Sequence, residues 1–262
     1  MKNYNALVSI IMPAYNAEET IRESIDSVIA QEYDSWELLV VDDGSTDNTK
    51  HIIESYQSSV ITLLSNQYVK GAAGARRTAI ESANGRYVAF LDSDDIWEPA
   101  KLKKQLAYMN STGADFVYSD YSTFQDSVSN VKSIVSACNK LSYEDLIKNC
   151  MIGCLTVVLD KTAFDDFEFP ITPKEDYAFW LKLLRQTDFA YKVPNTTSYY
   201  RLSDDSLSGN KIKEIKKQWF VIRKVEKTPL LKSLYCMLFY SFYGFFKHYI
   251  STRNGSNKKQ SK

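Results

Sequence analysis

The chain has 262 residues, 44% of them hydrophobic, and its 32 basic and 32 acidic side chains leave no formal net charge. This is the composition of an ordinary globular protein, with length enough for one large core or two small ones. We expect no nucleic-acid partner.

The first part of the chain alternates between strand and helix patterns. Asn16 predicts a helix start, with Glu19 as its capping-box partner. The buried face of this helix is expected at Ile21, Ile25, Val28 and Ile29. Apolar runs predict buried strands at residues 7–12, 36–41, 60–64, 86–91 and 114–118.

Three more helices are expected between these strands. The first covers residues 46–56, and a small-residue stretch over 71–83 leads into the second. Pro99 suits the first turn of the third, whose apolar face would hold Leu102, Leu106 and Met109. Strands joined by helices imply an α/β fold with a mostly parallel sheet covered on both faces.

Polar turns follow three of the expected strands. Residues 13–16, 42–43 and 92–95 each begin where an apolar run ends. Ligands of such sheets bind at the carboxyl ends of the strands, and parallel strands end on one edge. We therefore expect the three turns to converge on one crevice.

The turn after the fourth strand carries Asp92, Asp94 and Asp95 within four positions. Carboxylates this close repel one another unless a cation, hydrogen-bond donors or solvent compensates them. Mg²⁺ and Mn²⁺ prefer oxygen ligands and often share them with substrate phosphates. The turn therefore predicts a metal site; the alternative is a solvated acidic turn that caps the next helix.

The later part of the chain has two helical patterns. Glu175 and Asp176 precede the apolar positions of a helix that ends at Leu184, and carboxylates are stabilised at a helix N-terminus, so a plain helix start is one interpretation. Residues 233–246 form an uncharged aromatic run. As a helix this run would be about 21 Å long, too short for a hydrocarbon core of about 30 Å. It suits lying in the membrane interface; the alternatives are packing on the body of the protein or across a homodimer.

The C-terminal region is also basic. Residues 211–262 hold 13 Lys and Arg side chains against Glu214 and Glu226, which leaves 19 basic and 30 acidic residues in the rest of the chain. This asymmetry indicates an acidic body and a basic region that meets something anionic. Residues 251–262 are predicted to be a disordered tail.

The four cysteines form no CxxC pair, so we expect buried free thiols in a reducing compartment. The N-terminal residues do not resemble a signal peptide. The expected location is the cytoplasm, peripheral to the inner face of the cytoplasmic membrane.

Five motifs in order resemble the family 2 glycosyltransferases. They are PAYN at 13–16, VVDDGSTD at 40–47, GAAGAR at 71–76, FLDSDDIW at 90–97 and KEDYAFWLKLL at 174–184. The resemblance implies a GT-A fold over residues 1–210, with a nucleotide-sugar half at 1–118 and an acceptor half at 119–210. A helical extension at 211–250 would then associate with the membrane or with a second subunit.

The resemblance also implies roles in donor binding. Tyr15 would stack on uracil, or else be a core tyrosine. Asp42 would accept from the uracil N–H, or else cap the next helix. Arg76 would reach the base or the diphosphate, and Arg201 would close over the diphosphate or pair with Asp204 or Asp205. Further residues expected in this site are Pro13, Asn16, Gly74, Ser93, Asp95 and Trp97.

The metal and the catalytic base are implied in the same way. Asp94 would bind Mn²⁺ or Mg²⁺, and Asp92 would bind the metal or the ribose. Asp176 would be the general base that takes the proton of the acceptor hydroxyl. Glu175 would bind the acceptor or exchange roles with Asp176.

The expected activity is inverting transfer of a hexose or N-acetylhexosamine from a UDP-sugar to a sugar-diphosphate-lipid. The YYRLSDDSLS stretch at 199–208 and the aromatic C-terminal run resemble enzymes that build O-antigen or capsule repeat units, and a β linkage is implied. Alternatives are another cell-envelope acceptor such as teichuronic acid, a nucleotidyltransferase, or an inactive sugar-binding relative.

Overall fold

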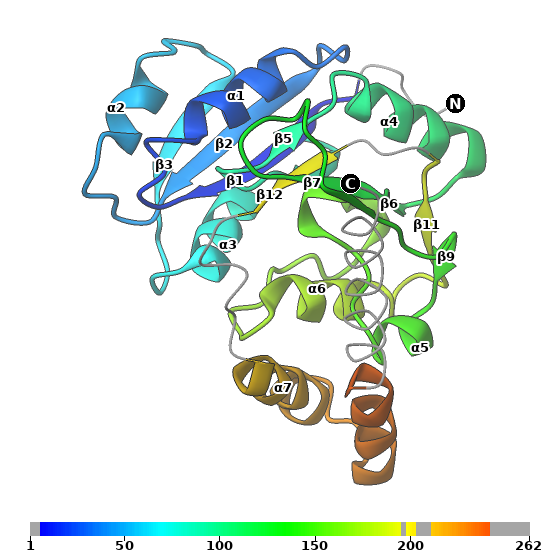
Figure 1. Cartoon of the computed structure of the whole chain (residues 1–262). Helices are drawn as coiled ribbons and strands as arrows, with labels where there is room; N and C mark the ends of the chain where they lie inside the picture. Colours follow the sequence, from blue (N-terminus) through cyan, green and yellow to red (C-terminus); the bar gives the residue numbers. More distant parts are fainter. Residues whose placement is uncertain (1–5, 195–197, 203–210, 242–262) are drawn as a thin grey trace, which may run out of the picture.

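The computed structural model describes residues 6–194, 198–202 and 211–241. Its centre is an eight-stranded sheet in the order β3-β2-β1-β4-β10-β6-β11-β9, in which β10 runs antiparallel to both neighbours and β9 antiparallel to β11 (Figure 1). The strands are β1 (Val8–Ala14), β2 (Trp36–Asp42), β3 (Ile61–Ser65), β4 (Tyr87–Phe90), β6 (Phe116–Tyr118), β9 (Lys140–Leu141), β10 (Val158–Asp160) and β11 (Ala190–Lys192). The expected mostly parallel sheet is confirmed, and the five predicted strands lie within two residues of the observed ones.

A smaller sheet lies beside the first. It has the order β5-β12-β7-β8, in which β12 runs parallel to β7 and antiparallel to β5. Its strands are β5 (Ile96–Trp97), β7 (Tyr121–Phe124), β8 (Ser133–Val135) and β12 (Ser198–Arg201). Because β5 directly follows the aspartate turn, this sheet brings Arg201 next to that turn.

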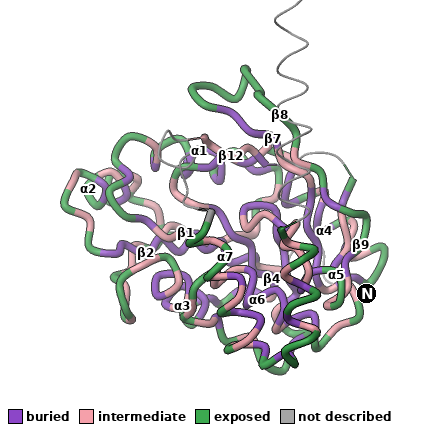
Figure 2. Tube along the Cα trace, turned by 60° about the horizontal axis from the view of Figure 1, so that its bottom comes forward, coloured by how far each residue is buried: buried purple, intermediate pink, exposed green. Residues whose placement is uncertain are grey.

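Helices cover both faces of the large sheet, and successive strand residues supply the two cores. Ile11, Val88 and Phe90 face one core with α3 and α6, whereas Ile10, Val40 and Ala89 face the other with α1 and α4. Figure 2 shows the buried segments gathered along the central strands, while the loop between β7 and β8 is exposed. The helices are α1 (Ile21–Ile29), α2 (Thr49–Glu54), α3 (Ala72–Ser82), α4 (Lys101–Thr112), α5 (Tyr143–Leu146), α6 (Glu175–Leu183) and α7 (Lys211–Phe220).

The helix predicted to start at Asn16 begins only at Ile21, so the predicted start and its capping box are wrong. Asn16 has a φ of 47°, which a helix cannot contain. Its side chain instead accepts a hydrogen bond from the Thr46 backbone N–H at 2.9 Å, tying the turn after β1 to the turn after β2. Ile29, expected to be buried, is 49% exposed at the end of the helix.

Two other helix starts also lie later than predicted. The helix expected from residue 46 begins at Thr49, because Asp47 accepts hydrogen bonds from the backbone and side chain of Thr49. Pro99 lies two residues before the start of α4 rather than in its first turn.

The C-terminal elements pack on the body of the protein. A π-helix (Val221–Val225) follows α7, and a further helix covers residues 230–241. Val221, Ile222 and Cys236 are fully buried in the same core as Trp180 of α6. In the described part of the chain, no helix combines the length and the apolar character needed to cross a bilayer. Residues 242–246 of the aromatic run and the predicted tail at 251–262 lie outside the described residues.

Candidate active site

A cavity of about 670 Å³ opens where β1, β2 and β4 end. Of the predicted donor-site and metal residues, eight line it: Pro13, Tyr15, Asn16, Arg76, Asp92, Ser93, Asp94 and Arg201. The predicted convergence of the three polar turns on one crevice is therefore confirmed.

Tyr15 lies at the mouth of this cavity. Its side chain is 48% exposed, so it is not a core tyrosine. The Lys70 ammonium lies 4.0 Å from the ring centroid, in a cation–π contact. The exposed ring can stack on a planar base, and Lys70 adds a positive charge that no sequence motif indicated.

The two acids after β2 differ in their environment. The Asp42 carboxylate is 2% exposed, accepts hydrogen bonds from the Gly44 and Ser45 N–H groups and pairs with Lys50 at 3.3 Å. Burial alone would raise the pKa of Asp42, but these partners lower it. The Asp42 side chain thus stabilises the turn that follows it by hydrogen bonding, whereas Asp43 lines the cavity. The uracil contact assigned to Asp42 stays a prediction, and the sequence analysis missed Asp43.

Asp95 and Trp97 do not line the cavity but support its wall. Asp95 is 1% exposed, and its carboxylate accepts the Arg201 backbone N–H at 3.0 Å. The Trp97 ring is buried and donates to the Leu155 carbonyl at 2.9 Å. Arg201 itself donates to the Asp94 carbonyl at 2.8 Å and pairs with Glu23 at 2.5 Å. The predicted partners Asp204 and Asp205 lie outside the described residues.

Gly74 is buried in α3 and faces the turn at residues 66–69 rather than the cavity. A Cβ atom at this position would lie 2.2 Å from the Val69 carbonyl oxygen, a backbone atom that cannot simply rotate away. We expect Gly74→Ala to lower the free energy of unfolding by about 1–3 kcal/mol, the usual cost of overpacking. Thermal unfolding measures this, with Ala73→Gly, at a half-buried position of the same helix, as a control for helix propensity. An unchanged melting temperature in Gly74→Ala would contradict the close packing.

Arg76 connects the cavity to α6. Its side chain is almost fully buried, and its two terminal nitrogens pair with Asp92 at 2.5 Å and with Glu175 at 2.6 Å. Burial would lower the pKa of Arg76, but Asp92 and the other nearby acids raise it well above its ordinary value. Its Nε, also buried, has no hydrogen-bond partner among the described residues. Arg76 therefore stays charged and fixes the position of Glu175 relative to the aspartate turn.

Asp94 is a cavity-lining acid of this turn whose pKa is raised, and the charges of Arg201 and Arg76 offset that rise only in part. Burial and the nearby Asp92 carboxylate raise the pKa of Asp94. Within the described ranges no ion pair is made by its carboxylate, and no three His, Cys, Asp or Glu side chains gather around a common metal position. Two cavity-lining carboxylates without a third ligand fit Mg²⁺ or Mn²⁺, which complete their shells with water and phosphate oxygens.

Asp176 lies in the first turn of α6, as predicted. Its carboxylate accepts the Tyr177 backbone N–H at 2.7 Å and makes no ion pair within the described part of the chain. Burial and, secondarily, the adjacent Glu175 raise the pKa of Asp176. A partly buried carboxylate with a raised pKa suits a general base, whereas Glu175 is held by Arg76.

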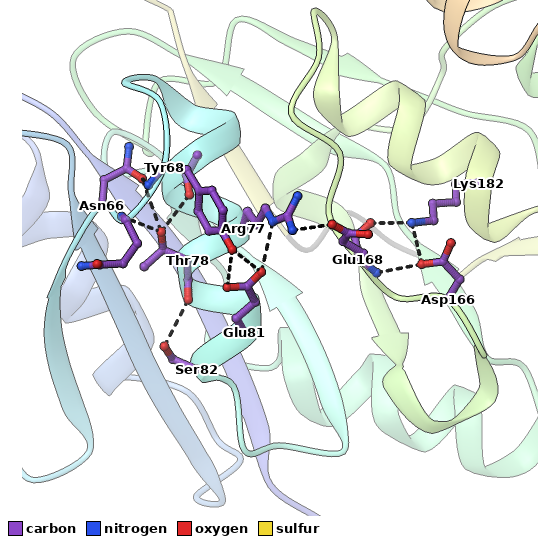
Figure 3. Close-up of polar contacts among 11 residues, drawn as sticks. Asn66, Tyr68, Arg77, Thr78, Glu81, Ser82, Asp166, Glu168 and Lys182 are labelled. Carbon is purple, nitrogen blue, oxygen red and sulfur yellow. Dashed lines mark hydrogen bonds and ion pairs between the residues drawn. The ribbon is translucent and has the colours of Figure 1, made fainter.

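An ion-pair network holds the segment before α6 from outside. Figure 3 shows Arg77 of α3 between Glu81 and Glu168, and Lys182 of α6 paired with Asp166. Lys182 also donates to the Glu168 carbonyl at 2.9 Å. Neighbouring arginines of α3 thus contact α6 and the segment that leads into it: Arg76 inside the protein and Arg77 at its surface.

Known proteins that are similar to this chain belong to one family. The sequence profile of glycosyl transferase family 2 matches residues 9–151. The chain is 48% identical to the Escherichia coli UDP-Glc:alpha-D-GlcNAc-diphosphoundecaprenol beta-1,3-glucosyltransferase WfgD, over 95% of this chain and 98% of that protein. It is 40% identical to the putative teichuronic acid biosynthesis glycosyltransferase TuaG of Bacillus subtilis, over 92% and 97%.

Solved structures agree on the fold. TarS of S. aureus, crystallised with UDP, has a TM-score of 0.65 at 22% identity, and the match covers 83% of this chain and 65% of that one. The mannosyltransferase PcManGT of Pyrobaculum calidifontis, solved with GDP-Man and Mn²⁺, has a TM-score of 0.63 at 20% identity, covering 85% and 66%. The sheet order, the convergent acidic turns and the match over residues 9–151 lead to one conclusion: the chain belongs to the family 2 glycosyltransferases and has the GT-A fold.

Proposed function

We propose that this protein transfers glucose from UDP-glucose to the N-acetylglucosamine of a lipid-linked diphosphate sugar, forming a β-1,3 linkage in an O-antigen or capsule repeat unit. The observation that carries the reaction type is the Arg76 bridge, which joins the acidic wall of the cavity to the helix of Asp176. The substrates are supported by the 48% identity to WfgD over nearly the whole chain and by 38% identity to WfaP, a second E. coli enzyme of the same named specificity.

In the proposed mechanism the acceptor hydroxyl attacks C1 of the glucose from the face opposite the diphosphate. Asp176 takes the hydroxyl proton as the new C1–O bond forms and the bond from C1 to the phosphate oxygen breaks, releasing UDP. A single displacement inverts the α configuration of the donor to β. Asp94 and Asp92 would hold Mn²⁺ or Mg²⁺, which would supply positive charge to stabilise the departing diphosphate.

Donor binding is proposed to use the other side of the cavity. The exposed Tyr15 ring would stack on uracil. Asp43 rather than Asp42 lines this part of the wall, although its carboxylate already accepts hydrogen bonds from Asn66 and Gly71. Arg201, held against the aspartate turn, would lie beside the diphosphate.

The experiment that tests this function presents the purified protein with UDP-glucose, UDP-galactose and their N-acetyl forms. Synthetic GlcNAc-diphosphate-lipid and GalNAc-diphosphate-lipid serve as acceptors, and products are identified by mass spectrometry. We expect transfer from UDP-glucose to the GlcNAc lipid. Donor hydrolysis without transfer would indicate a different acceptor, for which the similarity to TuaG favours a teichuronic acid intermediate. Neither hydrolysis nor transfer with any donor would support an inactive sugar-binding relative.

We also propose peripheral contact with the inner face of the cytoplasmic membrane. The helix at 230–241 turns an apolar face outward, formed by Leu230, Leu231, Leu234, Tyr235, Leu238 and Phe239, which are 47–82% exposed. We call this the C-terminal apolar face. Exposed lysines lie near it in the sequence: Lys216, Lys224 and Lys227. Apolar side chains flanked by basic ones suit an anionic lipid surface, which is where a lipid-linked acceptor resides.

Replacing Leu231 and Leu238 with serine is expected to reduce sedimentation with phosphatidylglycerol vesicles and to leave UDP binding unchanged. These two side chains are 82% and 71% exposed, so their loss removes apolar contact with lipid without opening a core. Ile134→Ser, at a 62% exposed position on β8, is the matched control and should bind vesicles as the wild type does. The contrary outcome has two parts: the double variant binds vesicles as well as the wild type does, and the wild type is a dimer whereas the variant is not. That outcome would assign the C-terminal apolar face to contact with a second subunit instead.

A further inference from the structure

Lys174 directly precedes the Glu175–Asp176 pair and has an unusual backbone. Its φ of 54° and ψ of 52° place it in the left-handed region, which residues other than glycine rarely adopt. Its carbonyl accepts the first hydrogen bond of α6, from Ala178 at 2.9 Å. The conformation of Lys174 therefore sets the direction in which α6 begins. Such a conformation persists only where the surroundings hold it.

The side chain of Lys174 is held by the C-terminal elements. Its ammonium donates to the Gln218 side-chain oxygen at 3.0 Å and to the Tyr240 hydroxyl at 3.2 Å, and lies 3.6 Å from the Glu214 carboxylate. It also lies 4.9 Å from the centroid of the Tyr240 ring. Only 16% of the Lys174 side chain is exposed, and Gln218 is fully buried. Figure 1 shows α7 and the helix at 230–241 adjoining the α6 end of the molecule.

The C-terminal elements are themselves fixed to the body at other points. The Glu226 carboxylate accepts the Tyr143 hydroxyl at 2.6 Å and pairs with Arg185 at 2.6 Å. Val221 and Cys236 are fully buried in the core that contains α6. Gln218 and Tyr240 thus present a fixed set of acceptors to the Lys174 ammonium.

We infer that Lys174 is a positioning residue through which the C-terminal helices hold the first turn of α6, and with it Asp176, in the geometry that transfer requires. The inference rests on the proposed role of Asp176 as base. Arg76 holds Glu175 from the cavity side, and Gln218 and Tyr240 of the C-terminal helices hold Lys174, the residue before it. The same helices carry the C-terminal apolar face, so the part of the protein proposed to contact lipid directly supports the catalytic turn.

Lys174→Met keeps the length of the side chain and removes the ammonium. We expect kcat to fall about 10- to 100-fold, the scale of a small misplacement of a reacting group, with the KM for UDP-glucose unchanged. Lys174→Arg, which keeps a cation, should recover most of the loss. Lys182→Met is the matched control, because it removes a lysine that anchors the other end of the same helix; its kcat should stay close to that of the wild type.

The partners of Lys174 give a second test by double-mutant analysis. Gln218→Leu should lower kcat on its own, and Lys174→Met combined with Gln218→Leu should be little worse than Lys174→Met alone, because both remove one contact. Independent, fully additive losses, or a Lys174→Met variant with wild-type kcat, would overturn the inference.

A third readout does not depend on the substrate. The amides of Tyr177 and Ala178 bond to Asp176 and Lys174, so their hydrogen exchange reports on the first turn of α6. Exchange should be faster in Lys174→Met and Gln218→Leu but not in Lys182→Met. Failure of the wild type to transfer glucose to any acceptor would refute the proposed function, and the exchange measurement would still decide the positioning role. Equal exchange in all four proteins would refute that role.

Discussion

Asp176→Asn is expected to lower sugar transfer by about 10²- to 10⁴-fold, the range typical of losing a general base, with UDP affinity nearly unchanged. The substitution keeps the shape of the side chain and its acceptor oxygen for the Tyr177 N–H. It removes only the capacity to take a proton. Initial rates of transfer, together with calorimetric titration of UDP, separate the chemical step from donor binding.

Glu175→Gln is the matched control for this prediction. Glu175 belongs to the same helix turn, but its carboxylate is paired with Arg76 at 2.6 Å. We expect a smaller loss of transfer than in Asp176→Asn, because a neutral amide can still accept from Arg76. If Glu175→Gln is crippled and Asp176→Asn is active, the roles of the two acids are exchanged.

The pH dependence of transfer follows from the environment of Asp176. A base must be deprotonated to act, and burial and Glu175 raise the pKa of Asp176. As the pH is lowered, activity should therefore already be lost at pH values above about 3.9, the ordinary pKa of an aspartate. The acid limb of kcat/KM against pH, which reports the free enzyme, measures this, and a limb at or below that ordinary value would contradict the raised pKa.

Asp94→Ala is expected to abolish Mn²⁺- or Mg²⁺-dependent transfer and to weaken UDP binding. The Asp94 and Asp92 carboxylates line the cavity close to one another, and removing one leaves too few oxygen ligands for a hard divalent cation. The measurements are transfer rates over a metal titration, and UDP titration with and without EDTA.

Asp126→Ala serves as the control for Asp94→Ala, because it removes an exposed acid in the loop between β7 and β8. It should show the metal dependence of the wild type. Full activity of the wild type after exhaustive EDTA treatment, or of Asp94→Ala itself, would contradict the metal assignment.

The strands and the covered sheet could be predicted from the sequence, because local patterns of apolar residues are enough to identify them. Continuous apolar runs such as that at residues 88–91 need burial on both faces, which only a covered sheet provides. Helix starts were less predictable, since they depend on partners far along the chain. Asn16 satisfies the preferences of a helix cap, yet its side chain bonds to Thr46, 30 residues away.

The site was predicted at the level of turns rather than of single side chains. The doublet Asp42–Asp43 could be placed at the sheet edge, but the sequence does not disclose which carboxylate turns inward to the Gly44 and Ser45 amides. Contacts between segments far apart in the chain could not be predicted from the sequence. Arg76 and Glu175 are 99 positions apart, and the contact of Lys174 with Gln218 joins elements that no motif related.

The anomeric configuration of the product tests the central claim most directly. Wild-type protein, UDP-glucose, Mn²⁺ and a synthetic GlcNAc-diphosphate-lipid would be incubated, and the disaccharide product examined by proton NMR. The proposed single displacement predicts a new β-glucosyl linkage, and the proposed specificity predicts its attachment to the 3-hydroxyl of GlcNAc. With Asp176→Asn this product should form about 10²- to 10⁴-fold more slowly. An α linkage, which requires retention of configuration, would contradict the account.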